Sequence, residues 1–250
     1  MIFKDLGVID YTLAWDEQEK LLAENIRRKR ISREPEAGSV QLTHAIDQDP
    51  GNKIWTTDSR LQTINYFLLC EHPPVYTLGK SGKKEHVLMS DEELDQQHIG
   101  FVNTNRGGDI TFHGLQQIVG YPILDLEKYS TDIGKYLRNL EELVILTLAA
   151  YGIKGERSKG ETGVWIDPGV PGKERKICAI GVRCSRWITM HGFALNVNTD
   201  LSYFNNIIPC GIQNKQVTSI EKELGHAVDQ AAAKDLIKKN FEKVFDSVLR

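Results

Sequence analysis

One cysteine in the sequence has neighbours that suit a nucleophile. Cys210 lies between Pro209 and Gly211, two residue types that disfavour regular secondary structure. The sequence therefore predicts an accessible cysteine in a loop. A nearby cation can lower the pKa of such a thiol from about 8.5 to roughly 3.5–7.5, and the resulting thiolate can carry an acyl group as a thioester. An inert structural cysteine is the alternative.

A lysine at the start of a predicted strand is the candidate partner of this cysteine. Lys176 directly precedes the apolar segment Ile177–Val182. A lysine that an apolar pocket partly withdraws from water is suited to act as a base on a thiol or an incoming amine. A solvated lysine at a strand end explains the same residue without chemistry.

Small residues alternate along this strand and the next one. A period of two places Ala179 and Gly181 on one face of the first strand. The same period places Gly192, Ala194 and Asn196 on one face of the second. Aligned pairing of these faces would leave a trough for a linear hydrocarbon chain, whose burial contributes about 0.8 kcal/mol per CH₂. Tight packing beneath a helix is the alternative.

Strict alternation along the strand creates a conflict for Lys176. It is out of phase with Ala179 and Gly181 and would face away from the trough. A catalytic Lys176 therefore requires a β-bulge, a twist or the strand end beside it. A regular strand through Lys176 would count against its pairing with Cys210.

A glycine-rich segment combines a cation, two glycines and a histidine. Its residues are Arg106-Gly107-Gly108-Asp109-Ile110-Thr111-Phe112-His113-Gly114. The glycines would let a ligand approach the backbone closely. A hairpin turn at Gly107-Gly108-Asp109, with His113 as a hydrogen-bonded strand residue, explains the same residues. The sequence leaves both interpretations open.

Composition excludes several classes of protein. A chain of 250 residues with 40% hydrophobic residues and a net charge of −3 is typical of a soluble globular protein without a dedicated nucleic-acid or anionic-membrane surface. The basic run Arg27–Arg30 fits a solvated helix face, with a docking patch as the alternative. The longest apolar run, Leu143–Ala150, is too short to cross a bilayer. No secretory segment follows Met1, which predicts a cytoplasmic protein.

The cysteine and motif inventory argues against metal and nucleotide sites. The sequence has no C-x-x-C pair, no H-E-x-x-H motif and no G-x-x-x-x-G-K-[ST] loop. We therefore expect no metal, and nothing signals ATP use through a phosphate-binding loop. Four cysteines without an export signal favour reduced thiols, and Cys70, Cys178 and Cys184 are expected to be buried apolar residues.

Periodicity and turn residues predict a mixed α+β domain over residues 1–250, with an antiparallel or mixed sheet beside helices. The predicted helices are Tyr11 to about Lys29, Ile133–Tyr151 capped by Gly152, a short helix opened by a Thr218-x-x-Glu221 capping box and ended by Gly225, and a long terminal helix marked by Ile237 through Val248. The predicted strands are Thr63–Cys70, Pro74–Leu78, Phe101–Thr104, Ile110–His113, Ile118–Leu126, Gly163–Ile166, Ile177–Val182 and Thr189–Val197, the last three forming a meander. Residues at about 34–59 are expected to be a long loop or an inserted hairpin.

These segments, in this order, resemble the lipoyl(octanoyl) transferase family, the octanoyl-acyl-carrier-protein:protein transferases of lipoate synthesis. The resemblance runs through His72–Gly79, Arg106–Gly114, Lys176–Arg183, Met190–Val197 and Pro209–Ile212. It implies the fold of biotin protein ligases and lipoate ligases, a mixed sheet flanked by helices. It also implies that Cys210 takes the acyl group as a thioester and that Lys176 lowers the pKa of its thiol.

The resemblance further implies which residues bind the acyl and phosphopantetheine groups. They are Arg106, Gly107, Gly108, Asp109, Ile110, Thr111, Phe112, His113, Ala179, Ile180, Gly181, Gly192, Phe193 and Ala194. The implied donor is octanoyl-loaded acyl carrier protein, which brings its own 4′-phosphopantetheine, and the implied acceptors are lipoyl domains of 2-oxoacid dehydrogenases and the glycine cleavage system. No cofactor, ATP or metal is implied.

Two other functions remain open at this stage. An ATP-dependent lipoate or biotin ligase of the same fold would need an adenylate site and no acyl-cysteine. A non-catalytic module that binds acyl carrier protein or lipoyl domains would keep the pocket without turnover, and its mark would be loss of Cys210 or Lys176. The sequence retains both residues.

Overall fold

The structure is a computed structural model that describes residues 1–33, 62–208 and 216–250. The predicted insertion at about 34–59 and the predicted nucleophile Cys210 lie outside these residues. No helix within the described ranges has the length and apolar character needed to cross a membrane.

The main sheet is mixed and contains eight strands among the described residues. Strands β1 and β2 run parallel, as do β9 and β11, and the other neighbours are antiparallel. In spatial order the strands are β1 (Ile2–Val8), β2 (Tyr66–Glu71), β6 (Gln117–Ile123), β10 (Ile188–Asn196), β9 (Arg175–Ser185), β8 (Val164–Ile166) and β7 (Glu156–Arg157), with β11 (Gln216–Val217) also paired to β9. The predicted meander of β8, β9 and β10 is confirmed.

A second sheet holds the glycine-rich segment in place. Its strands are β3 (Val75–Leu78), β4 (Gly100–Asn103) and β5 (Ile110–His113), in the order β4-β3-β5. Because β3 lies between the other two, the strands joined by Gly107-Gly108-Asp109 do not pair with each other. The hairpin interpretation of this segment is therefore wrong, and the segment instead contacts the main sheet, where the Gly107 N–H donates to the Val182 carbonyl of β9.

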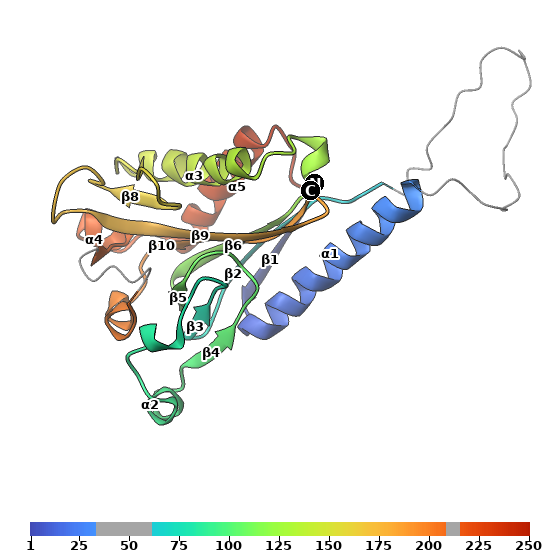
Figure 1. The fold of residues 1–250 in the computed structure, drawn as a ribbon. Coiled ribbons are helices and arrows are strands. Elements are labelled where there is room, and N and C mark those ends of the chain that lie inside the picture. The colour runs from blue at the N-terminus through green and yellow to red at the C-terminus, as the bar shows by residue number, and fades with distance from the viewer. Residues whose placement is uncertain (34–61, 209–215) are drawn as a thin grey trace, which may run out of the picture.

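Helices cover both faces of the main sheet, and Figure 1 shows α3 and α5 on one side and α1 on the other. Helices α3 (Ile133–Ala149) and α5 (Gln230–Val244) pack on the larger apolar core, and α1 (Tyr11–Arg33) packs on the smaller one against β6 and β10. Shorter helical segments are η2 (Lys84–His86), α2 (Asp91–Gln96), η3 (Leu126–Lys128), η4 (Leu201–Asn206) and α4 (Ile220–Leu224). The predicted α+β architecture is confirmed.

Two predicted helix ends are confirmed by backbone conformation. Gly152 and Gly225 both adopt left-handed φ values, +73° and +78°, which a glycine adopts without steric cost. The predicted capping box is wrong by one residue, because Ser219 caps α4 by accepting a hydrogen bond from the Lys222 N–H. The Thr218 hydroxyl instead donates to Glu223.

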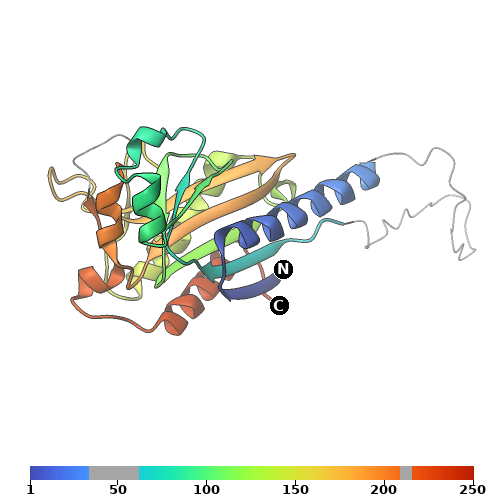
Figure 2. The ribbon, with the colours of Figure 1, turned by 90° about the horizontal axis from the view of Figure 1, so that it is seen from below.

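Two predicted elements are too long. Strand β6 ends at Ile123, and Leu126 already belongs to η3. The terminal helix ends at Val244, and Val248 is 63% exposed. The physical reason for the second error is long-range, because Arg250 exchanges backbone hydrogen bonds with Met1 and Phe3 and draws the chain end to the edge of β1. Figure 2 shows the two termini side by side.

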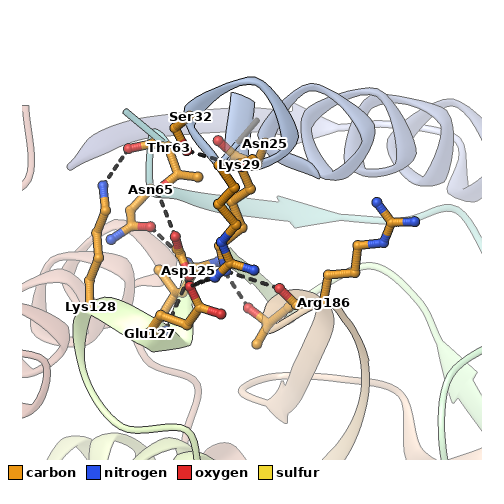
Figure 3. Close-up of polar contacts among 12 residues, drawn as sticks. Asn25, Lys29, Ser32, Thr63, Asn65, Asp125, Glu127, Lys128 and Arg186 are labelled. Atoms are coloured by element: carbon orange, nitrogen blue, oxygen red, sulfur yellow. Dashed lines mark hydrogen bonds and ion pairs between the residues drawn. The ribbon is translucent and has the colours of Figure 1, made fainter. Parts of the chain in front are cut away.

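A buried ion pair joins the C-terminal half of α1 to the turn after β6. Lys29 Nζ lies 2.6 Å from Asp125 Oδ1, and their side chains are only 8% and 5% exposed. The same ammonium donates to the Arg186 carbonyl, and the Thr63 hydroxyl donates to Asp125 Oδ2. Figure 3 shows Lys29 reaching from α1 toward Asp125, Glu127 and the Arg186 carbonyl.

Truncating this lysine is expected to be costly. The substitution Lys29→Ala should lower the free energy of unfolding by about 3–5 kcal/mol, because it leaves the buried Asp125 carboxylate without its cation. Lys20 is a matched control on the same helix, since its side chain is 75% exposed and lies 4.0 Å from Glu17. Lys20→Ala should cost less than about 0.5 kcal/mol in urea titrations. Equal midpoint shifts for the two variants would contradict this account.

Candidate active site

A cavity of about 420 Å³ lies where the glycine-rich segment meets the main sheet. Twelve of the fourteen predicted binding residues line it: Arg106, Gly108, Asp109, Ile110, Thr111, His113, Ala179, Ile180, Gly181, Gly192, Phe193 and Ala194. Gly107 and Phe112 do not line it. Phe112 is buried in the core of the second sheet, stacked on Tyr203, and Gly107 donates its N–H to the Val182 carbonyl.

A β-bulge brings Lys176 to the same cavity. Val164 pairs with Cys178, whereas the next residue of β8, Trp165, pairs with Lys176, so Ile177 is an extra residue in β9. Ile177 and Cys178 are both fully buried in the core. The phase of the strand reverses at this point, and Lys176 lines the cavity together with the predicted small residues. The predicted phase break is confirmed.

Gly163 permits this bulge. Its φ is +120°, and a Cβ at this position would lie 2.6 Å from the Cys178 carbonyl oxygen. Only glycine allows β8 to approach β9 so closely beside the extra residue. The Gly163 N–H donates to Glu141 Oε1, a fully buried carboxylate of α3 that also accepts from Arg157. The Glu141 carboxylate of α3 therefore fixes the backbone just before β8, next to the bulge in β9.

The Lys176 side chain is held next to an aromatic ring. Its Nζ lies 4.6 Å from the centroid of the buried Trp165 ring, which is a cation–π geometry. The Lys176 carbonyl accepts a hydrogen bond from the Thr218 N–H, and Lys176 pairs in parallel with Val217. Val217 lines the cavity, as does Phe204. Cys210, which lies outside the described residues, is therefore part of a segment flanked on both sides by cavity-lining residues.

Arg106 fastens the glycine-rich segment to the second sheet. The side chain is buried, and its guanidinium donates to both the carbonyl and the hydroxyl of Thr77, at 2.5 and 2.9 Å, and to the Gly107 carbonyl. Asp109 is also engaged, because its carboxylate accepts from the Ile110 N–H and pairs with His86 at 2.8 Å. These hydrogen bonds and the ion pair hold the glycine-rich segment in place as one wall of the cavity.

The segment lies so close to β9 that the strand needs a glycine. A Cβ on Gly181 would lie 2.7 Å from the Gly107 carbonyl oxygen and 3.3 Å from Arg106 Cδ. Gly181→Ala should therefore lower the free energy of unfolding by about 1–3 kcal/mol through overpacking. Gly169→Ala is the matched control, because no atom lies within 4 Å of its Cβ position and its φ is not left-handed. Denaturant midpoints that move equally in both variants would refute the close contact.

The histidines at the cavity are neutral. Burial holds the pKa of His113 well below 6.5, and the nearby His72 and Arg106 lower it further. His113 hydrogen-bonds Gln117 through Nδ1 and stacks on Tyr11. His113 therefore acts as a hydrogen-bonded wall residue, which fits one of the two roles left open by the sequence.

Several cavity residues were not among the predicted binding residues. Tyr11, Gln117, Tyr121, Glu161 and His191 line the cavity from α1, β6, β10 and the loop before β8. His191 belongs to a segment on which the family resemblance rests, so its position was a usable signal. The others come from parts of the chain that only tertiary packing brings to the site. Among the described residues, no group of three or more His, Cys, Asp or Glu side chains is placed to hold a metal ion.

Comparison with known sequences gives close relatives over nearly the whole chain. A protein of Flavobacterium psychrophilum named octanoyltransferase is 53% identical over 244 residues, covering 97% of this chain and 95% of the relative. A protein of Christiangramia forsetii with the same name is 50% identical over 248 residues, covering 99% and 96%. The lipoyl protein ligase A/B catalytic domain family matches residues 52–242.

Solved structures share the fold at low sequence identity. A bipartite lipoate protein ligase from Thermoplasma acidophilum has a TM-score of 0.61 and 14% identity, covering 100% of this chain and 85% of that one. A lipoate-protein ligase A bound with ATP has a TM-score of 0.59 and 13% identity, covering 100% and 86%. The lipoate ligase fold predicted from the sequence is therefore confirmed, and the chain belongs to the octanoyltransferases, acyltransferases within the lipoyl protein ligase A/B catalytic domain family.

Proposed function

We propose that this enzyme transfers an octanoyl group from acyl carrier protein to a lysine of a lipoyl domain, through a thioester on Cys210. The observation that carries the proposal is the bulge at Ile177, which places Lys176 on the cavity face beside Ala179 and Gly181. The names of the relatives support octanoyl as the acyl group. The proposed acceptors are the lipoyl domains of 2-oxoacid dehydrogenases and the glycine cleavage system.

The first half-reaction is an exchange of thioesters. The Cys210 thiolate attacks the carbonyl carbon of the octanoyl thioester on the acyl carrier protein. A new carbon–sulfur bond forms, the old one breaks, and the phosphopantetheine leaves as a thiolate that takes up a proton. The Lys176 ammonium favours the Cys210 thiolate beforehand and is a source for that proton afterwards.

The second half-reaction forms an amide. The neutral ε-amine of the acceptor lysine attacks the Cys210 thioester, the carbon–sulfur bond breaks, and the thiolate of Cys210 is restored. The amine loses one proton, which neutral Lys176 can accept and return to the ammonium state. An amide is more stable than a thioester, so this step drives the overall reaction toward product without an energy-rich nucleotide.

The cavity walls suit the octanoyl chain. Ala179, Gly181, Gly192 and Ala194 line the cavity along two adjacent strands, and Phe193 and Ile180 add apolar surface. Each buried methylene contributes about 0.8 kcal/mol to binding. The glycine-rich segment from Arg106 to His113 is the proposed wall for the acyl and phosphopantetheine groups.

The rival proposal is an ATP-dependent lipoate ligase, because a neighbour of the same fold is bound with ATP. A ligase activates a free acid as an adenylate and needs no cysteine adduct. The two functions therefore differ in their donor and in their covalent intermediate. A non-catalytic binding module differs from both in that it releases no product.

Intact-mass measurement separates these functions. The enzyme is incubated with octanoyl-acyl carrier protein in the absence of ATP, and then with an excess of a lipoyl domain. We expect one octanoyl adduct, located on Cys210 by peptide mapping, which disappears as the lipoyl domain gains the same mass. Octanoylation only from free octanoate and ATP, with no adduct on the enzyme, would establish the ligase. An adduct-free enzyme without product in either mixture would favour the binding module.

A further inference from the structure

Trp165 is the strand neighbour of Lys176 at the bulge. It is the residue of β8 that pairs with Lys176, and its side chain is buried. Paired residues on adjacent strands place their side chains within contact distance. The Lys176 Nζ lies 4.6 Å from the centroid of the indole ring, inside the limit of about 6 Å for a cation–π contact. The register shift that brings Lys176 to the cavity therefore also sets it against this ring.

Gly163 leaves the lysine side chain a path to the ring. A Cβ at Gly163 would lie 3.5 Å from Lys176 Cε, which is already van der Waals contact. A longer side chain at this position would compete for the space that the lysine occupies. Lysines at strand ends usually extend their ammonium into water, whereas Lys176 is half-buried and its ammonium lies against an aromatic face. Gly163 and Trp165 together direct the side chain.

An aromatic ring suits a lysine that has to activate a thiol. An apolar cavity withdraws the ammonium from water and so favours the neutral amine. The π face of the ring attracts the cation and offsets part of this cost. A carboxylate would also hold the cation, but its negative charge would repel the thiolate that Lys176 is proposed to stabilise. The ring favours the positive charge without adding a negative one.

Other ionisable groups surround Lys176 on several elements. The cavity presents Arg106, Asp109, His113 and Glu161, and the core side presents Cys178 and Glu141. Burial lowers the pKa of His113 and raises the pKa of the Cys178 thiol, so both groups are uncharged at neutral pH. The same holds for the other ionisable groups that line the cavity, which are Tyr11, Tyr121 and His191. A substitution of Trp165 changes none of these groups, so it isolates the contribution of the ring.

We propose that Trp165 is a positioning residue that holds Lys176 as an ammonium at the site of acyl transfer. This inference rests on the proposed transfer through Cys210 and identifies what keeps its basic partner charged inside the cavity. Before acylation, the ring favours the cation that stabilises the thiolate. During amide formation, it makes the neutral amine of Lys176 a stronger proton acceptor, because the ammonium that results lies against the ring.

The direct test follows the titration of Lys176 by NMR in the enzyme without donor. The side-chain carbons of lysine are isotope-labelled, and the Lys176 signal is identified by its absence in Lys176→Arg. Trp165→Leu removes the π face, and Trp165→Phe keeps one. We expect W165L to lower the pH at which half of Lys176 has lost its proton by about one unit, a tenfold fall in proton affinity. The upfield displacement of the Lys176 signals by the indole ring should disappear in the same variant, and W165F should lie closer to wild type.

Trp187→Leu is the matched control. Trp187 lies in the turn between β9 and β10, is 37% exposed and does not line the cavity. The Lys176 titration in W187L should match wild type. An unchanged titration and unchanged Lys176 signals in folded W165L would overturn the proposal. If W165L does not fold, fluorinated tryptophan replaces the natural residue at all four positions, which weakens the attraction of the π face and keeps the ring. A Lys176 titration that does not move to lower pH would then overturn it.

The acylation rate connects this contact to the reaction. The rate of adduct formation from octanoyl-acyl carrier protein at pH 7 should fall about tenfold or more in W165L, because the ammonium is no longer held in place. W165F should restore most of the rate, and W187L should keep all of it. A wild-type rate in W165L would remove Trp165 from the reaction and overturn the proposal. If wild type forms no adduct but the Lys176 titration moves in W165L, the proposed transfer fails and the role of Trp165 in keeping Lys176 charged stands.

Discussion

Cys210→Ala is expected to abolish octanoyl transfer, lowering the turnover rate by about 10⁴-fold or more. Alanine removes the sulfur that we propose holds the acyl group between the two half-reactions, and loss of a covalent nucleophile typically costs this much or more. No octanoyl adduct should then appear in the intact mass. The measurement is single-turnover transfer from octanoyl-acyl carrier protein to a lipoyl domain, followed by mass spectrometry of both proteins.

Cys184 is the matched control for this experiment. It is half-buried in β9, and burial raises the pKa of its thiol, so it is a poor nucleophile at neutral pH. Cys184→Ala should keep the transfer rate within about twofold of wild type. An octanoyl adduct that persists in Cys210→Ala, or that disappears in Cys184→Ala, would move the nucleophile away from Cys210.

Lys176→Ala is expected to slow Cys210 acylation by about 10²–10⁴-fold at pH 7, with recovery at higher pH. We propose that in wild type the Lys176 ammonium favours the thiolate form of Cys210 at neutral pH. Without it, the thiolate fraction should rise about tenfold per pH unit until the pH passes the free thiol value of about 8.5. The check is the rate of single-turnover acylation between pH 6 and pH 9.5.

Two variants show whether charge is the cause. Lys176→Arg keeps a cation, so its pH profile should stay flat near neutrality even if its geometry lowers the rate. Lys173→Ala removes an exposed lysine three residues earlier, and it should match wild type across the range. Parallel pH profiles for Lys176→Ala and wild type would remove Lys176 from the activation of Cys210.

Most of the longer strands and helices followed from local patterns in the sequence, whereas β1 and α2 were not predicted. The period of two in β9 and β10 predicted the trough of small residues, and Ala179, Gly181, Gly192 and Ala194 all line the cavity. Gly152 and Gly225 marked helix ends because left-handed φ values favour glycine. The errors at Thr218 and Val248 have different causes. The Thr218 hydroxyl donates to Glu223, five residues further along the chain, while Ser219 caps α4. At the chain end, backbone hydrogen bonds of Arg250 with Met1 and Phe3 override the local preference for helix.

The sequence by itself determined most of the elements, the family and the candidate residues, because periodicity, turn chemistry and ordered motifs are properties of the chain. Only the tertiary structure decided which side chains share the cavity. Lys176 and His191 both reach it by breaking the alternation of their strands, through the bulge at Ile177 and a left-handed φ. Those irregularities depend on distant contacts, from Gly163 to Cys178 and from Gln18 to His191. Local sequence patterns do not encode such contacts. The conflict in phase at Lys176 indicated that the strand must be irregular there if Lys176 faces the cavity.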